Sequence, residues 1–191
     1  MIEMRKWTLI LALFILVCSL GLSEEAVSIS TIPTHITIPT IGVDADILEY
    51  TNEQVSEDGG VVNPDYMDKV AWWSGGGTPG FTADEIVDNP ETIDFTVFFY
   101  GHSSNNDDRK VVFDDLDLLR IGDQIFLSME SEEFIYSIED VFIISKADFT
   151  SDSRVLTDSP GRLLLISCWR SWSGAAPTTD NVVVIAELVV N

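Results

Sequence analysis

Short apolar runs, each broken by glycine, proline or acidic residues, fill the sequence from residue 36 onward and constrain its fold most. Alternating apolar and polar residues predict half-buried strands at 36–39 and 41–47, and longer apolar runs predict strands at 95–100 and 163–167. Further strands are expected at 124–129, 134–138, 141–144 and 182–190. About eight strands with few helices and frequent turns indicate an all-β barrel or sandwich.

Helical patterns are rare in this chain. A short helix is expected near 66–70, after a turn rich in glycine and proline. Another is expected at 112–119, because apolar residues recur there at helical spacing. Residues 74–80 read as a loop on composition, and residues 82–93 as a loop or a short helix. The strands must therefore supply most of the core.

The N-terminus has the pattern of an export signal or of a short membrane anchor. Two basic residues, Arg5 and Lys6, precede a mainly apolar run of 16 residues that ends at Leu22. As a helix this run spans roughly 24 Å, slightly less than the hydrocarbon core of a bilayer. We therefore expect a signal or anchor at 1–22, a linker at 23–34 and one domain at 35–191. The domain should lie outside the cytoplasm, either tethered to the cell membrane or secreted after cleavage of the leader.

The chain is strongly acidic. Its net charge is −22, from 32 acidic and 10 basic residues. This balance excludes nucleic acid as a partner, since phosphate binding needs clustered lysine and arginine. It also argues against docking on an anionic membrane through a basic patch. Solubility and adaptation to high salt both explain the acidity. A recruited cation is less favoured because no Asp-x-Asp-x-Asp-Gly loop is present, and we expect no metal ligand and no cofactor.

One cysteine stands outside the leader. Cys168 ends the apolar run 163–167, whereas the other cysteine, Cys18, lies within the N-terminal apolar segment. Cys168 therefore has no disulfide partner in the exported domain, and an unpaired thiol in an oxidising compartment is a liability unless its chemistry is used. It is a candidate nucleophile. The alternative is an inert cysteine buried in the core.

A catalytic thiol needs a base or a cation nearby. The chain has two histidines, and His102 is the better placed because it directly follows the predicted strand 95–100. It precedes Cys168 by 66 residues, and both residues follow long apolar strands, so both can emerge at one end of a barrel. Arg170 is a candidate cation two residues after Cys168. The alternatives are a surface histidine and a solvated loop arginine.

Several short motifs follow one another in a recognisable order. Leu164-Leu165-Ile166-Ser167-Cys168 ends a strand, and Gly101-His102 follows another strand. The weaker motifs are Ile38–Ala45, Ala71-Trp72-Trp73, Pro79-Gly80, Phe113–Asp123 and Val183–Leu188. In order and spacing, over residues 36–190, this combination resembles a sortase, a cysteine transpeptidase of the cell envelope. It is most similar to the single-domain sortases of classes D, E and F.

The resemblance implies a fold and a reaction. The expected fold is all-β, a closed or nearly closed eight-stranded β-barrel with short helices and loops. Cys168 would attack the threonine carbonyl of a Leu-Pro-x-Thr-Gly-like sorting signal, while His102 moves the protons. The thioester would then pass to an amine of a cell-wall precursor or of a pilin lysine. Trp169 and Trp172 would wall the substrate groove, or alternatively serve ordinary packing.

One position departs from the family pattern. The essential arginine of sortases falls at Asn181, which can donate a hydrogen bond to an oxyanion but lacks the charge of arginine. The oxyanion stabiliser would be Asn181 or Arg170. Otherwise the chain is a catalytically impaired barrel that binds sorting-signal peptides or envelope proteins. A papain-like hydrolase is disfavoured, because there the cysteine precedes the histidine.

Overall fold

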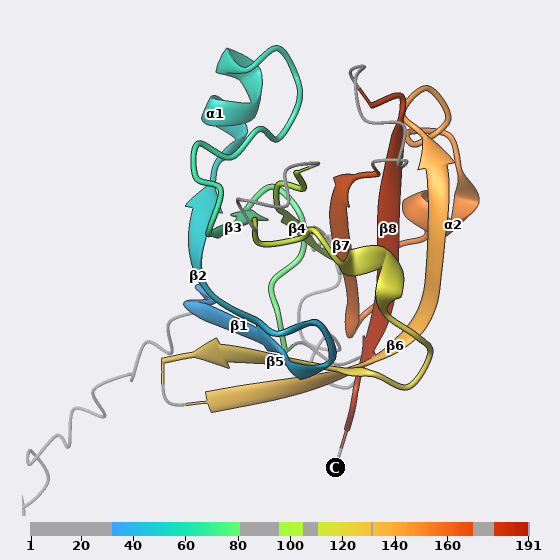
Figure 1. The fold of residues 1–191 in the computed structure, drawn as a ribbon. Helices are drawn as coiled ribbons and strands as arrows, with labels where there is room; N and C mark the ends of the chain where they lie inside the picture. Colours follow the sequence, from blue (N-terminus) through green and yellow to red (C-terminus); the bar gives the residue numbers. More distant parts are fainter. Residues whose placement is uncertain (1–31, 81–95, 105–110, 131, 170–177, 191) are drawn as a thin grey trace, which may run out of the picture.

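The described residues of the computed structural model are 32–80, 96–104, 111–130, 132–169 and 178–190, and within them eight strands close into a barrel (Figure 1). Around the barrel the strand order is β1-β2-β3-β4-β7-β8-β6-β5. The strands are β1 His35–Ile38, β2 Val43–Tyr50, β3 Val70–Trp73, β4 Val97–Tyr100, β5 Gln124–Met129, β6 Glu132–Ser145, β7 Arg162–Cys168 and β8 Asp180–Leu188. The structure confirms the all-β prediction and shows that the strands form a barrel rather than a sandwich.

Helices in the described residues are short. They are α1 Asn52–Glu57, α2 Ser153–Leu156 and the 3₁₀ turns η1 Pro39–Ile41 and η3 Leu116–Leu118. Most neighbouring strands pair antiparallel, but β2 pairs β3 and β4 pairs β7 in parallel. The pairing of β4 with β7 joins two halves of the chain and brings together the ends of two apolar runs.

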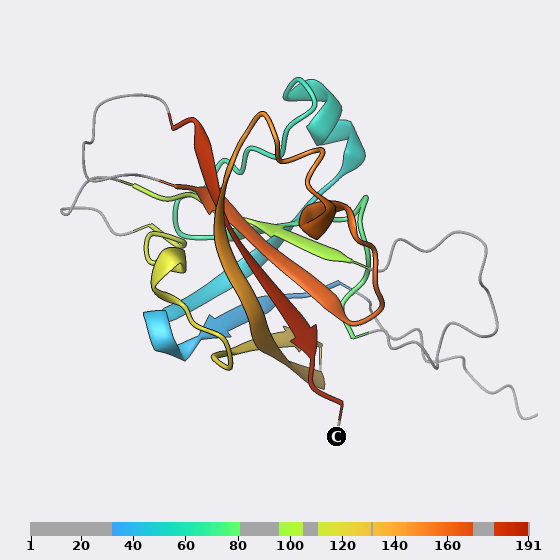
Figure 2. The same cartoon turned by 90° about the vertical axis from the view of Figure 1, so that its right-hand side faces the viewer.

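Strands β7 and β8 are buried on both faces. The inward side chains join the barrel core, which includes Phe99, Leu165 and Val184. The outward side chains form a second apolar cluster, which we call the outer cluster: Ile144, Val155, Leu164, Ile166, Val183 and Ile185. Helix α2 supplies Val155 to this cluster from outside the sheet (Figure 2). Coverage of both faces explains why residues 163–166 are continuously apolar rather than alternating.

The predicted helix at 66–70 is wrong. Residues 66–69 form no helix, and Val70 begins β3, which pairs with both β2 and β4. The helix of this region is α1 instead. Its first turn is closed by a capping box, in which the Thr51 hydroxyl accepts from the Gln54 amide and the Gln54 side chain accepts from the Thr51 amide.

Other boundaries also differ from the prediction. The expected helix at 112–119 is a turn that holds only η3, although the apolar residues at helical spacing, Phe113, Leu116 and Leu119, are buried. The two strands expected at 134–138 and 141–144 are one strand, β6, with a register irregularity between Ile138 and Asp140. Strand β2 begins at Val43 because Gly42, with φ 65°, closes a left-handed turn before it.

Some predicted segments lie outside the described residues. They are the leader 1–22, most of the linker 23–34 and the acidic segment 82–93. Across the part of the chain that is described, no helix has both the length and the apolar character that a membrane span requires.

Candidate active site

The register of β4 and β7 brings His102 to Cys168. Paired residues of these parallel strands are 66 positions apart, from Val97 with Leu163 to Tyr100 with Ile166. The pairing continues past β4, since the Gly101 amide donates to the Ile166 carbonyl at 3.1 Å. Continued for two more residues, the same offset matches His102 with Cys168, and both residues line one cavity. Their separation of 66 residues in the sequence therefore equals the offset between paired residues of β4 and β7.

On its other side Cys168 pairs with Asn181, the second residue of β8. Directly opposed residues of an antiparallel pair point to the same face of a sheet. Cys168 also shares a face with Leu164 and Ile166, because side chains alternate along a strand. His102, Cys168 and Asn181 thus form a row at one end of the barrel, on the face that carries the outer cluster.

Hydrogen bonds on both sides fix the backbone around the cysteine. The Ser103 hydroxyl donates to the Cys168 carbonyl. The Ser167 hydroxyl, which is buried, donates to the Gly101 carbonyl at 2.8 Å. The Trp169 amide donates to a carbonyl of β8 at 2.9 Å. Cys168 itself is a free, partly exposed thiol, so a rigid backbone presents its sulfur to the surface.

The imidazole of His102 is held by a backbone carbonyl. Its Nε2 lies 2.6 Å from the Pro64 carbonyl oxygen. A carbonyl oxygen can only accept a hydrogen bond, so Nε2 must carry the hydrogen. The other ring nitrogen, Nδ1, is then the one that can exchange a proton with a substrate. The segment that contains Pro64 was read from the sequence as a turn only, and its part in orienting His102 had no sequence signal.

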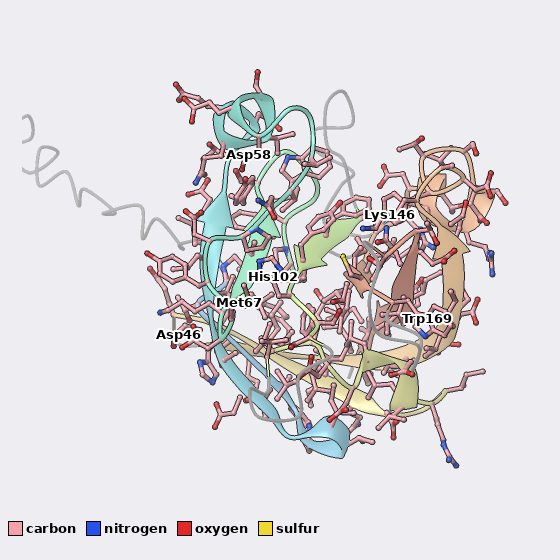
Figure 3. The ribbon with its side chains drawn as sticks, turned by 45° about the horizontal axis from the view of Figure 1, so that its top comes forward. Asp46, Asp58, Met67, His102, Lys146 and Trp169 are labelled. Carbon is pink, nitrogen blue, oxygen red and sulfur yellow. The ribbon has the colours of Figure 1, made fainter. Side chains whose placement is uncertain are left out.

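A lysine that the sequence did not single out contacts the thiol. The Nζ atom of Lys146 lies 3.4 Å from the Sγ atom of Cys168. Lys146 directly follows β6, and its amide donates to the Thr179 carbonyl at 2.8 Å, which anchors it beside the start of β8. Figure 3 shows Lys146 on the side of β6 and His102 on the side of β2 and β3. Cationic and basic groups thus flank Cys168.

These residues share one cavity of about 730 Å³. The described lining includes His102, Lys146, Cys168 and Asn181. The cavity is also lined by Ile166 of the outer cluster and by Phe98 and Tyr100, which pack against that cluster. The remaining walls come from the segment after α1 and from α2. A mainly apolar groove of this size with a few polar groups at one end suits an extended peptide.

The other residues that the sequence suggested for the site are not among the described residues that line this cavity. Trp169 is half-buried, packs against the barrel core and is not among the cavity-lining residues that are described, which favours the packing alternative. Arg170 and Trp172 lie outside the described residues. The second histidine, His35, is on β1, where its Nε2 lies 2.5 Å from an Asp44 carboxylate oxygen. Within the described ranges no three potential metal ligands gather.

Comparison with known proteins gives one consistent family. The family model described as the sortase domain matches residues 36–189. Similar solved structures include sortase C-1 from Actinomyces oris, with a TM-score of 0.57, 19% identity and coverage of 83% of this chain and 74% of that one. Sortase A from Listeria monocytogenes has a TM-score of 0.57, 16% identity and coverage of 84% and 89%.

A sortase D5 transpeptidase from Clostridium perfringens is also similar, with a TM-score of 0.54, 20% identity and coverage of 83% of this chain and 79% of that one. At these identities the solved structures establish likeness of fold. No curated protein matches the chain. The residues that the family model matches include most of the barrel and the whole row of His102, Cys168 and Asn181.

Proposed function

This chain belongs to the sortase family, and from that membership we propose that it is an active cysteine transpeptidase with Cys168 as its nucleophile. The observation that carries the proposal is the register of β4 and β7, which sets His102 beside Cys168 at the head of an apolar groove. A nucleophile, a proton carrier and a cation within one cavity are the groups that acyl transfer needs.

The first half of the reaction forms an acyl-enzyme. The Cys168 thiol first gives its proton to Nδ1 of His102. The resulting thiolate attacks the carbonyl carbon of the scissile peptide bond, a carbon–sulfur bond forms, and the carbonyl electrons move onto oxygen. When the oxyanion collapses, the carbon–nitrogen bond breaks and His102 delivers a proton to the leaving amine. A thioester remains on Cys168. Because Pro64 holds Nε2 of the imidazole, Nδ1 is the nitrogen assigned to this transfer.

The second half returns the enzyme to its starting state. His102, now without its extra proton, removes one from an incoming amine, which attacks the thioester carbon. The carbon–sulfur bond then breaks and a new amide bond is released. We propose a Leu-Pro-x-Thr-Gly-like sorting signal as the acyl donor, because its apolar residues suit the floor of the groove. The amine would come from a cell-wall precursor or a pilin lysine. The N-terminal segment would hold the domain at the outer face of the membrane, where such substrates emerge.

Intact-mass spectrometry tests this proposal. The protein is incubated with a peptide library of the form Leu-Pro-x-Thr-Gly, with and without an added amine. We expect an adduct on the wild type that Cys168→Ala lacks, and loss of turnover in His102→Ala. The matched control is His35→Ala, since that histidine sits on β1 beside Asp44 and should keep full activity. Absence of any adduct that depends on Cys168 would refute the assignment.

A second function is favoured by one observation, the asparagine at position 181. Without the family arginine the barrel would bind sorting-signal peptides but leave them uncut. Fluorescence anisotropy with the same library separates the two functions. Saturable binding by the wild type, unchanged in Cys168→Ala and accompanied by no adduct, would support the binding protein. Binding followed by acylation would support the transpeptidase.

A further inference from the structure

We infer that Lys146 supplies the positive charge of this active site, in place of the arginine that position 181 lacks. Its ammonium stabilises the Cys168 thiolate before attack and the substrate oxyanion after it. The first role rests on the geometry of the protein alone, whereas the second rests on the proposed transpeptidase function. Lys146 contacts the reacting sulfur directly, with Nζ 3.4 Å from Sγ.

The strand register explains how a lysine just after β6 reaches a cysteine on β7. Asn181 of β8 pairs with Cys168 on one side and with Ile144 of β6 on the other. Lys146 lies two residues beyond Ile144 and its amide still bonds to the backbone before β8. The long lysine side chain spans β8 from there. Asparagine is shorter than arginine, so position 181 leaves this path across the strand open.

Three of the other lysines and arginines whose positions are described are engaged away from the cavity, and the fourth, Arg120, is exposed and does not line it. Lys69 pairs with Asp46 at 3.0 Å. Arg154 pairs with the carboxylate at the start of α2 and lies over an aromatic ring of β6. Arg162 is buried and donates to two backbone carbonyls. Among the described residues that line the cavity, Lys146 is the sole lysine or arginine. In a chain of net charge −22, this placement leaves one described candidate for the catalytic cation.

A cation at this point favours both steps of the chemistry. A thiolate is the nucleophilic form of cysteine, and a neighbouring lysine favours it over the thiol. As the sulfur bonds to the carbonyl carbon, negative charge leaves the sulfur and appears on the oxygen attached to that carbon. An ammonium has three N–H donors and can follow this charge without releasing a proton. Lys146 therefore stays protonated throughout, and His102 carries all the protons that move.

The test compares Lys146→Gln with Lys146→Arg and with a matched control, Lys69→Gln. The first readout needs no substrate: the rate at which iodoacetamide alkylates Cys168 at neutral pH, followed by intact mass and corrected with Cys168→Ala for reaction at Cys18. We expect Lys146→Gln to slow alkylation roughly tenfold and Lys146→Arg to preserve it. Lys69→Gln should match the wild type. An unchanged alkylation rate in Lys146→Gln would overturn the thiolate role.

The second readout is peptide turnover. Loss of one oxyanion-stabilising group typically costs about 10²–10³ in rate, so Lys146→Gln should fall by that factor. Adding Asn181→Arg to Lys146→Gln should restore much of the turnover, because the arginine then supplies the positive charge from position 181, where other sortases carry it. No rescue, with normal circular dichroism, would contradict the oxyanion role. If the wild type itself turns over no peptide, the proposed function fails, and the alkylation rates still decide whether Lys146 supports the thiolate.

Discussion

The glycine before the catalytic histidine is required by packing, which Gly101→Ala tests. A Cβ at position 101 would lie 2.8 Å from Cε2 of Phe113 and 2.8 Å from Cγ1 of Val112, and closer still to Cδ2 of Phe113. Ordinary carbon contacts are about 3.5–4.0 Å. Phe113 is fully buried, so its ring has no solvent to swing into. Its amide also donates to the His102 carbonyl at 2.9 Å, so a displaced Phe113 pulls on the histidine.

The expected cost follows from this geometry. The ring or the backbone must move by roughly 1 Å, and overpacking of this kind costs about 1–3 kcal/mol. For a domain of this size, 1 kcal/mol corresponds to about 2–4 °C in Tm, which predicts a fall of roughly 2–12 °C. Turnover should fall more steeply than stability explains, because the imidazole moves away from Cys168. Gly101→Ala therefore acts on both folding and chemistry.

Thermal unfolding and peptide turnover of four variants provide the assay. The comparator is Gly42→Ala, where φ is 65° but no atom lies within 4 Å of the added Cβ. It should lose about 1–2 kcal/mol from backbone strain alone and keep its turnover per folded molecule. Phe113→Leu makes room, so Gly101→Ala and Phe113→Leu together should cost less than the sum of the two. Additive losses, or a wild-type Tm in Gly101→Ala, would refute the packing argument.

Three further predictions concern buried polar groups. Tyr136→Phe removes the hydroxyl that accepts the 3.0 Å hydrogen bond from the Gly80 amide, and its free energy of unfolding should fall by about 1 kcal/mol. Because burial raises the pKa of Tyr136 to about 12, the wild type should lose more stability than this variant as pH rises from about 10 toward 12, which thermal melts of both proteins would show. Partial burial raises the pKa of Glu187 and so disfavours its charged form in the fold; the Tm of Glu187→Gln relative to the wild type should therefore rise as pH increases from about 4.5. Ser167→Ala should cost about 1–2 kcal/mol in chemical denaturation by leaving the buried Gly101 carbonyl unbonded, whereas Ser167→Thr should cost less.

Strands were predictable because their signal is local. Gln124–Met129 matches the prediction residue for residue, and the run that became β7 was correct to within one residue at each end. Strand β3 was missed because it has only four residues, and its pairing partners are distant in sequence. Helix α1 did carry a local signal, the Thr51-x-x-Gln54 capping box, which the apolar pattern alone overlooks.

Cysteine and histidine are rare in this chain, and their rarity is what made Cys168 and His102 candidates for the active site. The separation of His102 from Cys168 carries meaning only once β4 is known to pair with β7 in parallel, since the register then fixes the same offset of 66. The sequence does not state which strands pair. The order of short motifs supplied that information indirectly, through resemblance to a family whose fold makes this pairing.

The position of Lys146 beside Cys168 could not be predicted from the sequence, for a physical reason. Its position is set by two successive antiparallel registers, from Cys168 to Asn181 and from Asn181 to Ile144, and an irregularity in β6 shifts the second one. A search for the cation beside Cys168 in sequence, or at the aligned position of the family arginine, therefore misses it. A positive charge within reach of the sulfur and the oxyanion favours catalysis, and that charge does not have to come from a particular strand. At this end of the barrel β6, β7 and β8 are neighbours, so a long side chain just after β6 can serve where a short one stands on β8.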